Sequence, residues 1–337
     1  MGKMRALAAA SIIPLMLAGT SAMAGTFKPV AAPAGSVSAG VIGINDQGDV
    51  TGSFTSDGVT ESVFAGSIDG TYETFDVDGV SAQGRSINNQ GRIVGITFPE
   101  GSLNSFDRPK NGAPALVTKD GTPVIGIAQG VSASGDFVGD YFGEPGSVPL
   151  RGGYKGKNAA YQSDVTLPFP TVRVAPRAIN AKGDVAGWFV AEAGGATQGF
   201  VIQNGVTTVL NYPDAAVTFI QGMNNKGELS GSWEDAGGGS HGFHLASDLE
   251  TWTSFDAPEG DFTQAWQINN LGQIAVTGVG ATTNSMFIYC PKKAGVCNGK
   301  GEKTGAEKAA KGKKASAPDL TRHGRDPDEK PGRGHRQ

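Results

Sequence analysis

Acidic residues are the side chains of this 337-residue chain that could most readily carry chemistry, and many of them follow short glycine-containing turns. Two carboxylates that converge in a cleft can hydrolyse a glycosidic bond, at about 5 Å for retention or about 6.5–9.5 Å for inversion of configuration. The candidates are Asp136, Asp140, Glu144, Asp184, Glu192, Glu228, Glu234 and Asp235. Spacing along the chain leaves their separations open, and the same carboxylates would also solvate an exported surface.

Two tryptophans form a second candidate set. Trp188 and Trp233 each come shortly after a glycine of a repeated phrase, at what we predict to be equivalent positions in adjacent repeats, where they would line one shared groove if they contact a ligand. With Glu234 and Asp235 they are the candidate ligand-binding residues, because an indole ring offers a flat apolar face together with a polar N–H. The alternative is that both indoles pack in the core.

The sequence has no H-E-x-x-H or P-loop pattern, and the glycine run at 237–239 is interpreted as a loop. His241 and His244 are three residues apart and would point to opposite faces of a strand, so one metal ion could not easily take both. We interpret them as solvated loop histidines. The sequence therefore identifies no catalytic residue, and we expect no metal site and no cofactor.

The elements that position these residues come from a phrase that occurs six times, at 42–52, 86–95, 130–139, 178–187, 222–231 and 267–278. Its shared glycines are 43, 44, 48, 44 and 45 residues apart, a period that suits one four-stranded propeller blade. The phrase I-N-x-x-G-x-[IV]-x-G fits a hairpin turn with an asparagine cap and a left-handed glycine. Calcium binding is the alternative, but the acidic residues differ between copies. The turn residues are Asn45, Gly48, Asn88, Gly91, Gly135, Asn180, Gly183, Asn224, Gly227, Asn269 and Gly272, with Ser132 in place of asparagine in the third copy.

One aromatic residue follows each turn glycine by 15–19 residues: Phe64, Phe106, Tyr154, Phe200, Phe243 and Phe287. A matched aromatic in every repeat predicts a core layer between neighbouring sheets. A platform for stacking carbohydrate is the alternative.

The two ends of the repeat array predict how it closes. The last unit supplies two strands before the composition changes, and residues 30–35 resemble residues 255–260. We therefore predict an all-β, six-bladed β-propeller closed by a composite blade, with two strands from each end of the chain, which would leave no exposed sheet edge at the seam.

The phrases G-I-N-x-x-G-x-I-V-G, the downstream G-F-V or G-F-H and the F-D-x-P-G-like turn resemble the HAF-repeat proteins, a family of probable bacterial extracellular repeat proteins. The similarity covers roughly residues 30–290. It implies an extracellular repeat protein and no particular activity. Ser132 and Val276 depart from the pattern, which affects the strand details of the third and sixth copies.

The chain divides into three parts by composition. Residues 1–24 read as a signal peptide, with Lys3 and Arg5 before an apolar stretch and small residues at the cleavage site. Residues 25–290 form the propeller, and residues 291–337 form a basic tail with 13 Lys/Arg against 6 Asp/Glu, predicted to be disordered. The body holds 13 basic and 26 acidic residues, so its net charge is opposite to that of the tail.

Export sets the expectations for compartment and partners. We expect a secreted or periplasmic monomer with no transmembrane segment after cleavage of the signal peptide. In an oxidising compartment we also expect a disulfide between Cys290 and Cys297. The tail lacks aromatic residues for base stacking, so we expect no sequence-specific nucleic-acid binding. It would instead contact anionic envelope polymers or lipids; the alternative is that it folds back on the acidic propeller. The predicted function is a non-catalytic binding or scaffold protein for a glycan or cell-envelope partner. The alternative is a carbohydrate-active hydrolase or lyase that uses acidic residues near the propeller axis.

Overall fold

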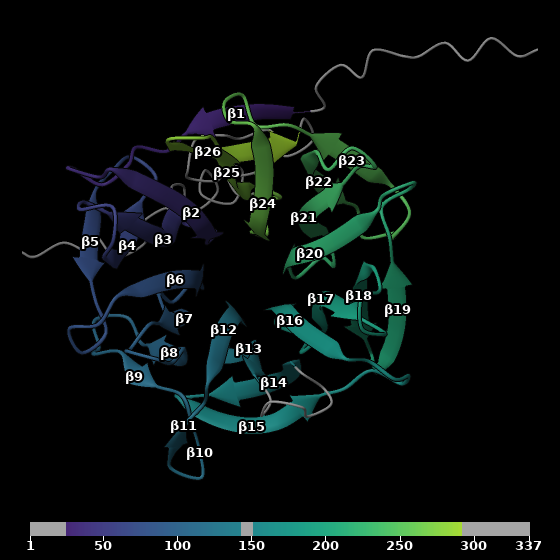
Figure 1. Ribbon diagram of the computed structural model, residues 1–337, viewed down its shortest axis with the longest axis horizontal. Helices are drawn as coiled ribbons and strands as arrows, with labels where there is room; N and C mark the ends of the chain where they lie inside the picture. Colours follow the sequence, from purple (N-terminus) through teal and green to yellow (C-terminus); the bar gives the residue numbers. More distant parts are fainter. Residues whose placement is uncertain (1–24, 143–150, 292–337) are drawn as a thin grey trace, which may run out of the picture. The chain divides into compact units, whose positions relative to one another are not determined.

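The computed structural model describes residues 25–142 and 151–291, and these residues fold into strands joined by turns and loops. The expected all-β class is confirmed. The sheets are arranged around a common axis in the manner of a β-propeller (Figure 1). The predicted signal peptide, Glu144, Cys297 and the tail beyond Pro291 lie outside the described residues. No helix in the described ranges is long and apolar enough to cross a membrane.

Three sheets are antiparallel meanders of four consecutive strands. Their strands are β2 (Ser38–Ile44), β3 (Asp49–Thr55), β4 (Glu61–Ser67) and β5 (Tyr72–Phe75); β6 (Ala82–Ile87), β7 (Ile93–Thr97), β8 (Asn104–Arg108) and β9 (Ala115–Leu116); and β20 (Val217–Met223), β21 (Leu229–Glu234), β22 (Ser240–Leu245) and β23 (Trp252–Phe255). The strand that leads into each repeated phrase lies nearest the axis (Figure 1).

A larger sheet of ten strands contains two further meanders. Its strands are β12 (Gly126–Val131), β13 (Asp136–Phe142), β14 (Arg151–Lys157) and β15 (Ala160–Val165); β16 (Arg173–Ile179), β17 (Val185–Val190), β18 (Thr197–Gln203) and β19 (Val206–Leu210); and the short hairpin β10 (Thr118–Lys119) and β11 (Thr122–Pro123). The two meanders are connected by a single parallel pair, Arg151 with Arg173, and the hairpin is attached where Thr118 pairs with Ala160.

The last sheet contains strands from both ends of the described chain. Its order is β1 (Gly25–Pro29), β26 (Asn284–Pro291), β25 (Ile274–Val279) and β24 (Phe262–Ile268). β1 pairs antiparallel with β26, from Gly25 opposite Pro291 to Pro29 opposite Phe287. The expected allotment of two strands from each end is wrong, because β24 begins its own sheet instead of ending the preceding one. The C-terminal segment therefore provides three strands and the N-terminal segment one, while residues 30–35 form a loop.

Six buried apolar clusters lie between successive four-stranded meanders, and one of them joins the last sheet to the first. The predicted aromatic layer is confirmed: Phe64, Phe106, Tyr154, Phe200, Phe243 and Phe287 are all buried. Phe64 lies opposite Gly52 in the β3–β4 register. A Cβ on Gly52 would lie 2.9 Å from the Phe64 ring and 1.9 Å from the main-chain oxygen of Gly40, so this close packing of ring and strand requires a glycine.

Candidate functional site

Each repeated phrase forms a turn at one end of the axis, and an asparagine side chain caps five of the six turns. Oδ1 of Asn45 accepts hydrogen bonds from the main-chain N–H groups of Gln47 and Asp49, at 3.0 and 2.9 Å. The turn glycine, Gly48, has a φ of 83°. A residue with a side chain would be strained in this left-handed conformation. Asn88, Asn180, Asn224 and Asn269 cap their own turns in the same way.

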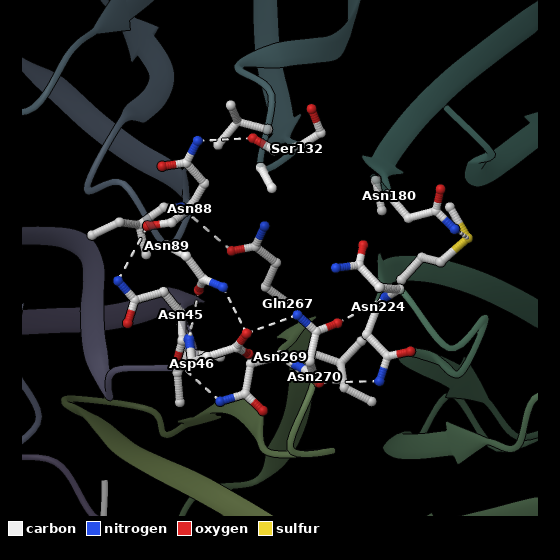
Figure 2. Close-up of a pocket in the computed structure, with 18 of the residues that line it drawn as sticks. Asn45, Asp46, Asn88, Asn89, Ser132, Asn180, Asn224, Gln267, Asn269 and Asn270 are labelled. Atoms are coloured by element: carbon white, nitrogen blue, oxygen red, sulfur yellow. Dashed lines mark hydrogen bonds between the residues drawn. The ribbon is translucent and has the colours of Figure 1, made fainter. Parts of the chain in front are cut away.

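The same asparagines also connect neighbouring sheets. Nδ2 of Asn45 donates to the main-chain oxygen of Asn88 at 3.1 Å, and Asn88 donates to that of Ser132 at 2.8 Å (Figure 2). Asn224 bonds Asn269 in this manner at 3.0 Å. Nδ2 of Asn269 then donates to the oxygen of Asn45, also at 3.0 Å. We call the six equivalent positions Asn45, Asn88, Ser132, Asn180, Asn224 and Asn269 the asparagine ring.

The asparagine ring is interrupted at its third and fourth members. Ser132 has no amide to donate to the next turn and instead bonds Ser134. Nδ2 of Asn180 bonds Asp184 at 2.9 Å and lies 4.0 Å from Sδ of Met223. The ring surrounds a cavity of about 60 Å³, which is too small for a sugar. Its amides are engaged in the turns, so this end of the axis is structural.

The innermost strands surround the rest of the axis, and a β-bulge recurs in the second half of each of them. The register of every innermost strand shifts three positions before the asparagine-ring residue. The residues at this position are Ile42, Arg85, Gln129, Arg177, Gln221 and Trp266. A bulge turns a side chain out of the regular alternation of a strand and is frequent beside functional sites. We call these bulge residues, with Gln83, Trp188 and Gln264, the axial mouth.

Hydrogen-bond donors of the axial mouth are left without partners. Nε of Arg85, Nε of Arg177, Nε1 of Trp188 and Nε1 of Trp266 are buried and have no hydrogen-bond acceptor among the described residues. The guanidinium of Arg177 lies 5.2 Å from the Trp188 ring, and that of Arg85 lies 6.0 Å from the Trp266 ring. A buried donor gives up its hydrogen bonds to water, and without a protein acceptor nothing compensates for that loss. Four such donors in one region therefore indicate a place where a ligand or water supplies the acceptors.

Asp140 on β13 is fully buried beside these donors but is already engaged. Gln129 donates to its Oδ1 at 3.0 Å, and Nε of Arg151 donates to its Oδ2. Arg151 also lies 5.6 Å from the Trp188 ring. Because both of its oxygens accept hydrogen bonds and the side chain is enclosed, Asp140 serves to hold Arg151 and has no free oxygen to act on a substrate.

Two cavities open at the axial mouth and share Gln264 and Trp266. One, of about 260 Å³, is lined by Glu61, Gln83 and Arg85 among other residues. The other, of about 200 Å³, is lined by residues that include Arg177, Gln221 and Glu234. Together they approach the size of small-ligand sites in proteins. Their walls combine guanidinium, amide, carboxylate and indole groups, which suits an oxygen-rich ligand.

Burial lowers the pKa of both unpaired guanidiniums. For Arg177 the pKa falls to about 9; the charge of Asp140 opposes the fall, whereas Arg151 and Arg85 add to it. For Arg85 burial is again the main cause, with Asp140 and Glu61 acting in the opposite direction. Neither guanidinium makes an ion pair within the described part of the chain. Both therefore lack a counterion in direct contact.

The structure separates the two tryptophans that the sequence placed together. Trp188 comes one residue after the glycine opposite Phe200, whereas Trp233 comes two residues after the glycine opposite Phe243, so the two are not in equivalent positions. Trp188 is 6 % exposed and packs edge-on against Phe219 beside the axial mouth.

Trp233 belongs to a different environment. Its ring stacks at 4.2 Å on Tyr212 and at 4.5 Å on His241, and its Nε1 donates to Ser254. Successive residues of a strand face opposite sides, which explains the separation. The predicted shared groove between Trp188 and Trp233 is therefore not formed.

The neighbours of Trp233 also divide. Glu234 lines the 200 Å³ cavity, whereas Asp235 accepts hydrogen bonds from the N–H groups of Gly237 and Gly239, both at 2.8 Å. His241 and His244 lie on β22 and not in a loop. Nδ1 of His241 is 2.7 Å from Asp256, and Nε2 is 3.4 Å from Asp235.

The other carboxylates named from the sequence lie mainly in turns or strands where they have local partners. Asp184 bonds Asn180, Glu228 bonds Asn224, and Asp136 is paired with Lys157 at 3.0 Å. Glu192 is exposed. Among the described residues no group of three or more His, Cys, Asp or Glu side chains is arranged to hold a metal ion.

Arg85, Arg177, Gln264 and Trp266 were not identified from the sequence. One signal was available: Arg85, Gln129, Arg177, Gln221 and Trp266 all precede the asparagine-ring position by three residues. Charged or amide side chains at one fixed position of otherwise apolar strands indicate a shared location. The alternation rule alone does not reveal it, because the bulge changes which face these residues occupy.

Comparison with known proteins bears on the fold. No family model matches the chain, and no curated protein matches its sequence. The structure is similar to TolB from Acinetobacter baumannii, with a TM-score of 0.51 and 10 % identity over 73 % of this chain and 64 % of that one. A streptogramin B lyase (TM-score 0.46, 12 % identity, 78 % and 97 % covered) and a gluconolactonase from Xanthomonas campestris (0.47, 13 %, 79 % and 98 %) are also similar. The likeness to TolB agrees with the propeller-like arrangement and carries no activity.

Proposed function

We propose that this chain is an exported, non-catalytic six-bladed β-propeller that binds a glycan or another cell-envelope partner at the axial mouth. The four unpartnered buried donors of Arg85, Arg177, Trp188 and Trp266 are the observation that carries the proposal. Sugars present many hydroxyl and ring oxygens, and the neighbouring Gln83, Gln221 and Gln264 add amides that can both donate and accept.

The six blades follow from dividing the ten-stranded sheet at its single Arg151–Arg173 pair, which separates two antiparallel meanders of four strands. The β1–β26 pairing and the hydrogen bond from Asn269 to Asn45 support closure of this ring. Burial of apolar clusters between every pair of successive sheets supports this arrangement.

Export, the Cys290–Cys297 disulfide, contact of the basic tail with anionic polymers and membership in the HAF-repeat family complete the proposal. They rest on the sequence patterns given above. Cys290 lies buried at the end of β26, where a disulfide would fix the strand that receives β1.

The alternative function is a carbohydrate-active hydrolase or lyase. Glu61 and Glu234 support it, because each lines one of the two cavities that meet at Gln264 and Trp266. Asp140 does not support it, since its oxygens are held by Gln129 and Arg151. We favour binding over catalysis because donors, not free carboxylates, predominate at the axial mouth.

A glycan array probed with the secreted full-length protein tests the proposal, followed by a reducing-end release assay on each glycan that binds. We expect retention of a defined set of glycans, no release of reducing ends, and loss of retention in the Trp266→Ala variant. Release of reducing ends that stops in Glu61→Gln or Glu234→Gln would establish the enzyme instead. Absence of any glycan binding would refute the glycan as the ligand of the axial mouth.

A further inference from the structure

Two charged side chains of the axial mouth would have no negatively charged partner if the ligand were a neutral sugar. Arg85 and Arg177 hold their guanidiniums in a partly buried setting, each beside an indole ring. Neither has a carboxylate in direct contact within the described residues, and Arg151 adds a third positive charge nearby. Like charges held together out of water are unfavourable unless a negative group lies among them.

The carboxylates of the protein do not complete this cluster. Asp140 has both oxygens occupied by Gln129 and Arg151. Glu61 accepts a hydrogen bond from Gln83, and Glu234 lines the cavity with Arg177 without forming an ion pair with it. The protein thus supplies fewer negative contacts than its three guanidiniums can use.

We propose that the ligand of the axial mouth is an acidic saccharide, whose carboxylate is received by Arg85 and Arg177. This inference rests on the proposed function and specifies its ligand class. A guanidinium offers a planar fork of donors that matches the two oxygens of a carboxylate. The donors that point here without acceptors are the ones such a group would engage.

The rest of the site favours a sugar over a bare inorganic anion. The two adjoining cavities, of about 260 and 200 Å³, are far larger than an oxyanion needs. Trp266 borders both and leaves its Nε1 free to donate to a hydroxyl or ring oxygen. Gln264 is exposed between them and can bind further hydroxyls.

The net negative charge of the body means that only the arginines of the axial mouth, and not the rest of the surface, would attract an acidic ligand. Residues 25–290 carry 26 acidic against 13 basic side chains, so the propeller surface as a whole repels polyanions. An acidic saccharide would be retained only through short-range contacts with the arginines. Its binding would weaken as ionic strength rises, because direct charge–charge contacts that are partly open to solvent are screened.

The test compares the full-length protein with Arg85→Gln, Arg177→Gln and the double variant on an array that carries both uronate-containing and neutral glycans. Lys182→Gln is the matched control, because it also removes one positive charge but lies exposed in a turn of the asparagine ring. Melting temperatures of all variants verify that they are folded. Inorganic phosphate is added as a competitor in a parallel experiment.

We expect the retained glycans to contain a carboxylate. Each arginine variant should bind them about tenfold or more weakly, while Lys182→Gln binds as the parent does. Retention of neutral glycans, or equal binding of acidic glycans by the double variant, would overturn the acidic ligand while leaving glycan binding intact. Phosphate that displaces the glycan at equal concentration would show a simple anion site and also overturn it. An array with no bound glycan would refute the glycan ligand on which this inference rests.

Discussion

Asn269 donates a hydrogen bond from its side-chain amide to the main-chain oxygen of Asn45, 3.0 Å away in space and 224 residues earlier in the chain. The same amide bonds Oε1 of Gln273, and the side-chain oxygen caps the turn of Asn269 itself. One buried side chain therefore stabilises its own turn and the contact between the last and first repeats.

Replacing Asn269 by serine should lower the free energy of unfolding by about 1–2 kcal/mol more than replacing Asn180 by serine. Both variants weaken a turn cap, but only Asn269 gives up a hydrogen bond to the main-chain oxygen of a neighbouring repeat. Urea denaturation midpoints measure the difference. Equal losses would show that the bond between repeats contributes nothing.

The interruption at Ser132 predicts a stabilising substitution. Asparagine at this position would have an amide directed toward the turn of Asn180, as its equivalents have toward theirs. We expect Ser132→Asn to raise the free energy of unfolding by about 0.5–1.5 kcal/mol. An unchanged or lower midpoint would mean that the third and fourth turns are too far apart for this bond.

Gly183 tests the turn conformation without steric interference. Its φ is 83°, and a Cβ there would meet no atom within 4 Å. Gly183→Val should therefore cost about 2–3 kcal/mol from backbone strain alone, whereas Gly183→Asn should cost less than about 1 kcal/mol. Thermal unfolding of the two variants separates strain from crowding. A valine variant as stable as the asparagine variant would contradict the left-handed turn.

The β1 strand should be needed for stability because Phe27 fills the outer side of the last sheet. Its ring lies 5.9 Å from Phe255, 5.9 Å from Phe287 and 5.1 Å from Tyr289. We expect Phe27→Ala to cost about 2–3 kcal/mol. Lys28→Ala, which removes an exposed ion pair with Asp69, should cost less than about 0.5 kcal/mol. Comparable denaturation midpoints for the two would argue against the packing of β1.

His241 predicts a dependence of stability on pH. Burial favours its neutral form, but hydrogen bonds and charge interactions with Asp256 and Asp235 outweigh burial and raise its pKa above the ordinary 6.5. A raised pKa in the folded state means that protonation stabilises the fold. The contribution is complete below pH 6.5 and disappears as pH rises through the folded-state pKa.

The stability difference between the parent protein and His241→Gln should therefore be largest in mildly acidic solution and shrink above neutrality. NMR titration of the imidazole, together with unfolding curves at several pH values, measures both quantities. Asp256→Asn should lower the histidine pKa. A histidine that titrates at or below 6.5 in the parent would refute the assignment.

The sequence predicted the parts of the fold that depend on local chemistry. The turn asparagines, the left-handed glycines and the one aromatic residue per repeat recur at fixed spacing, and each has a local physical reason. The seam was predicted incorrectly because the hydrophobic pattern does not say which strand begins a sheet. Assigning β24 to the preceding sheet produced a division of two and two strands, where the pairing is three and one.

The candidate site was harder to predict for a geometric reason. Counting from the nearest glycine placed Trp188 and Trp233 in equivalent positions, although they are one register position apart and so face opposite sides of their sheets. Arg85 and Arg177 influence each other electrostatically, although they lie on separate sheets that bulge at equivalent positions. Such convergence depends on the angle between sheets, which residue spacing does not determine.

The pairing of Gly25 with Pro291 has a mechanical consequence. These residues form the first rung of the β1–β26 ladder, so the polypeptide enters and leaves the described body at the same place. A force that pulls the two ends apart would act on one rung at a time and peel β1 away, instead of loading all five rungs together. The protein should therefore unfold under low tension applied through its ends, with β1 the first strand to detach.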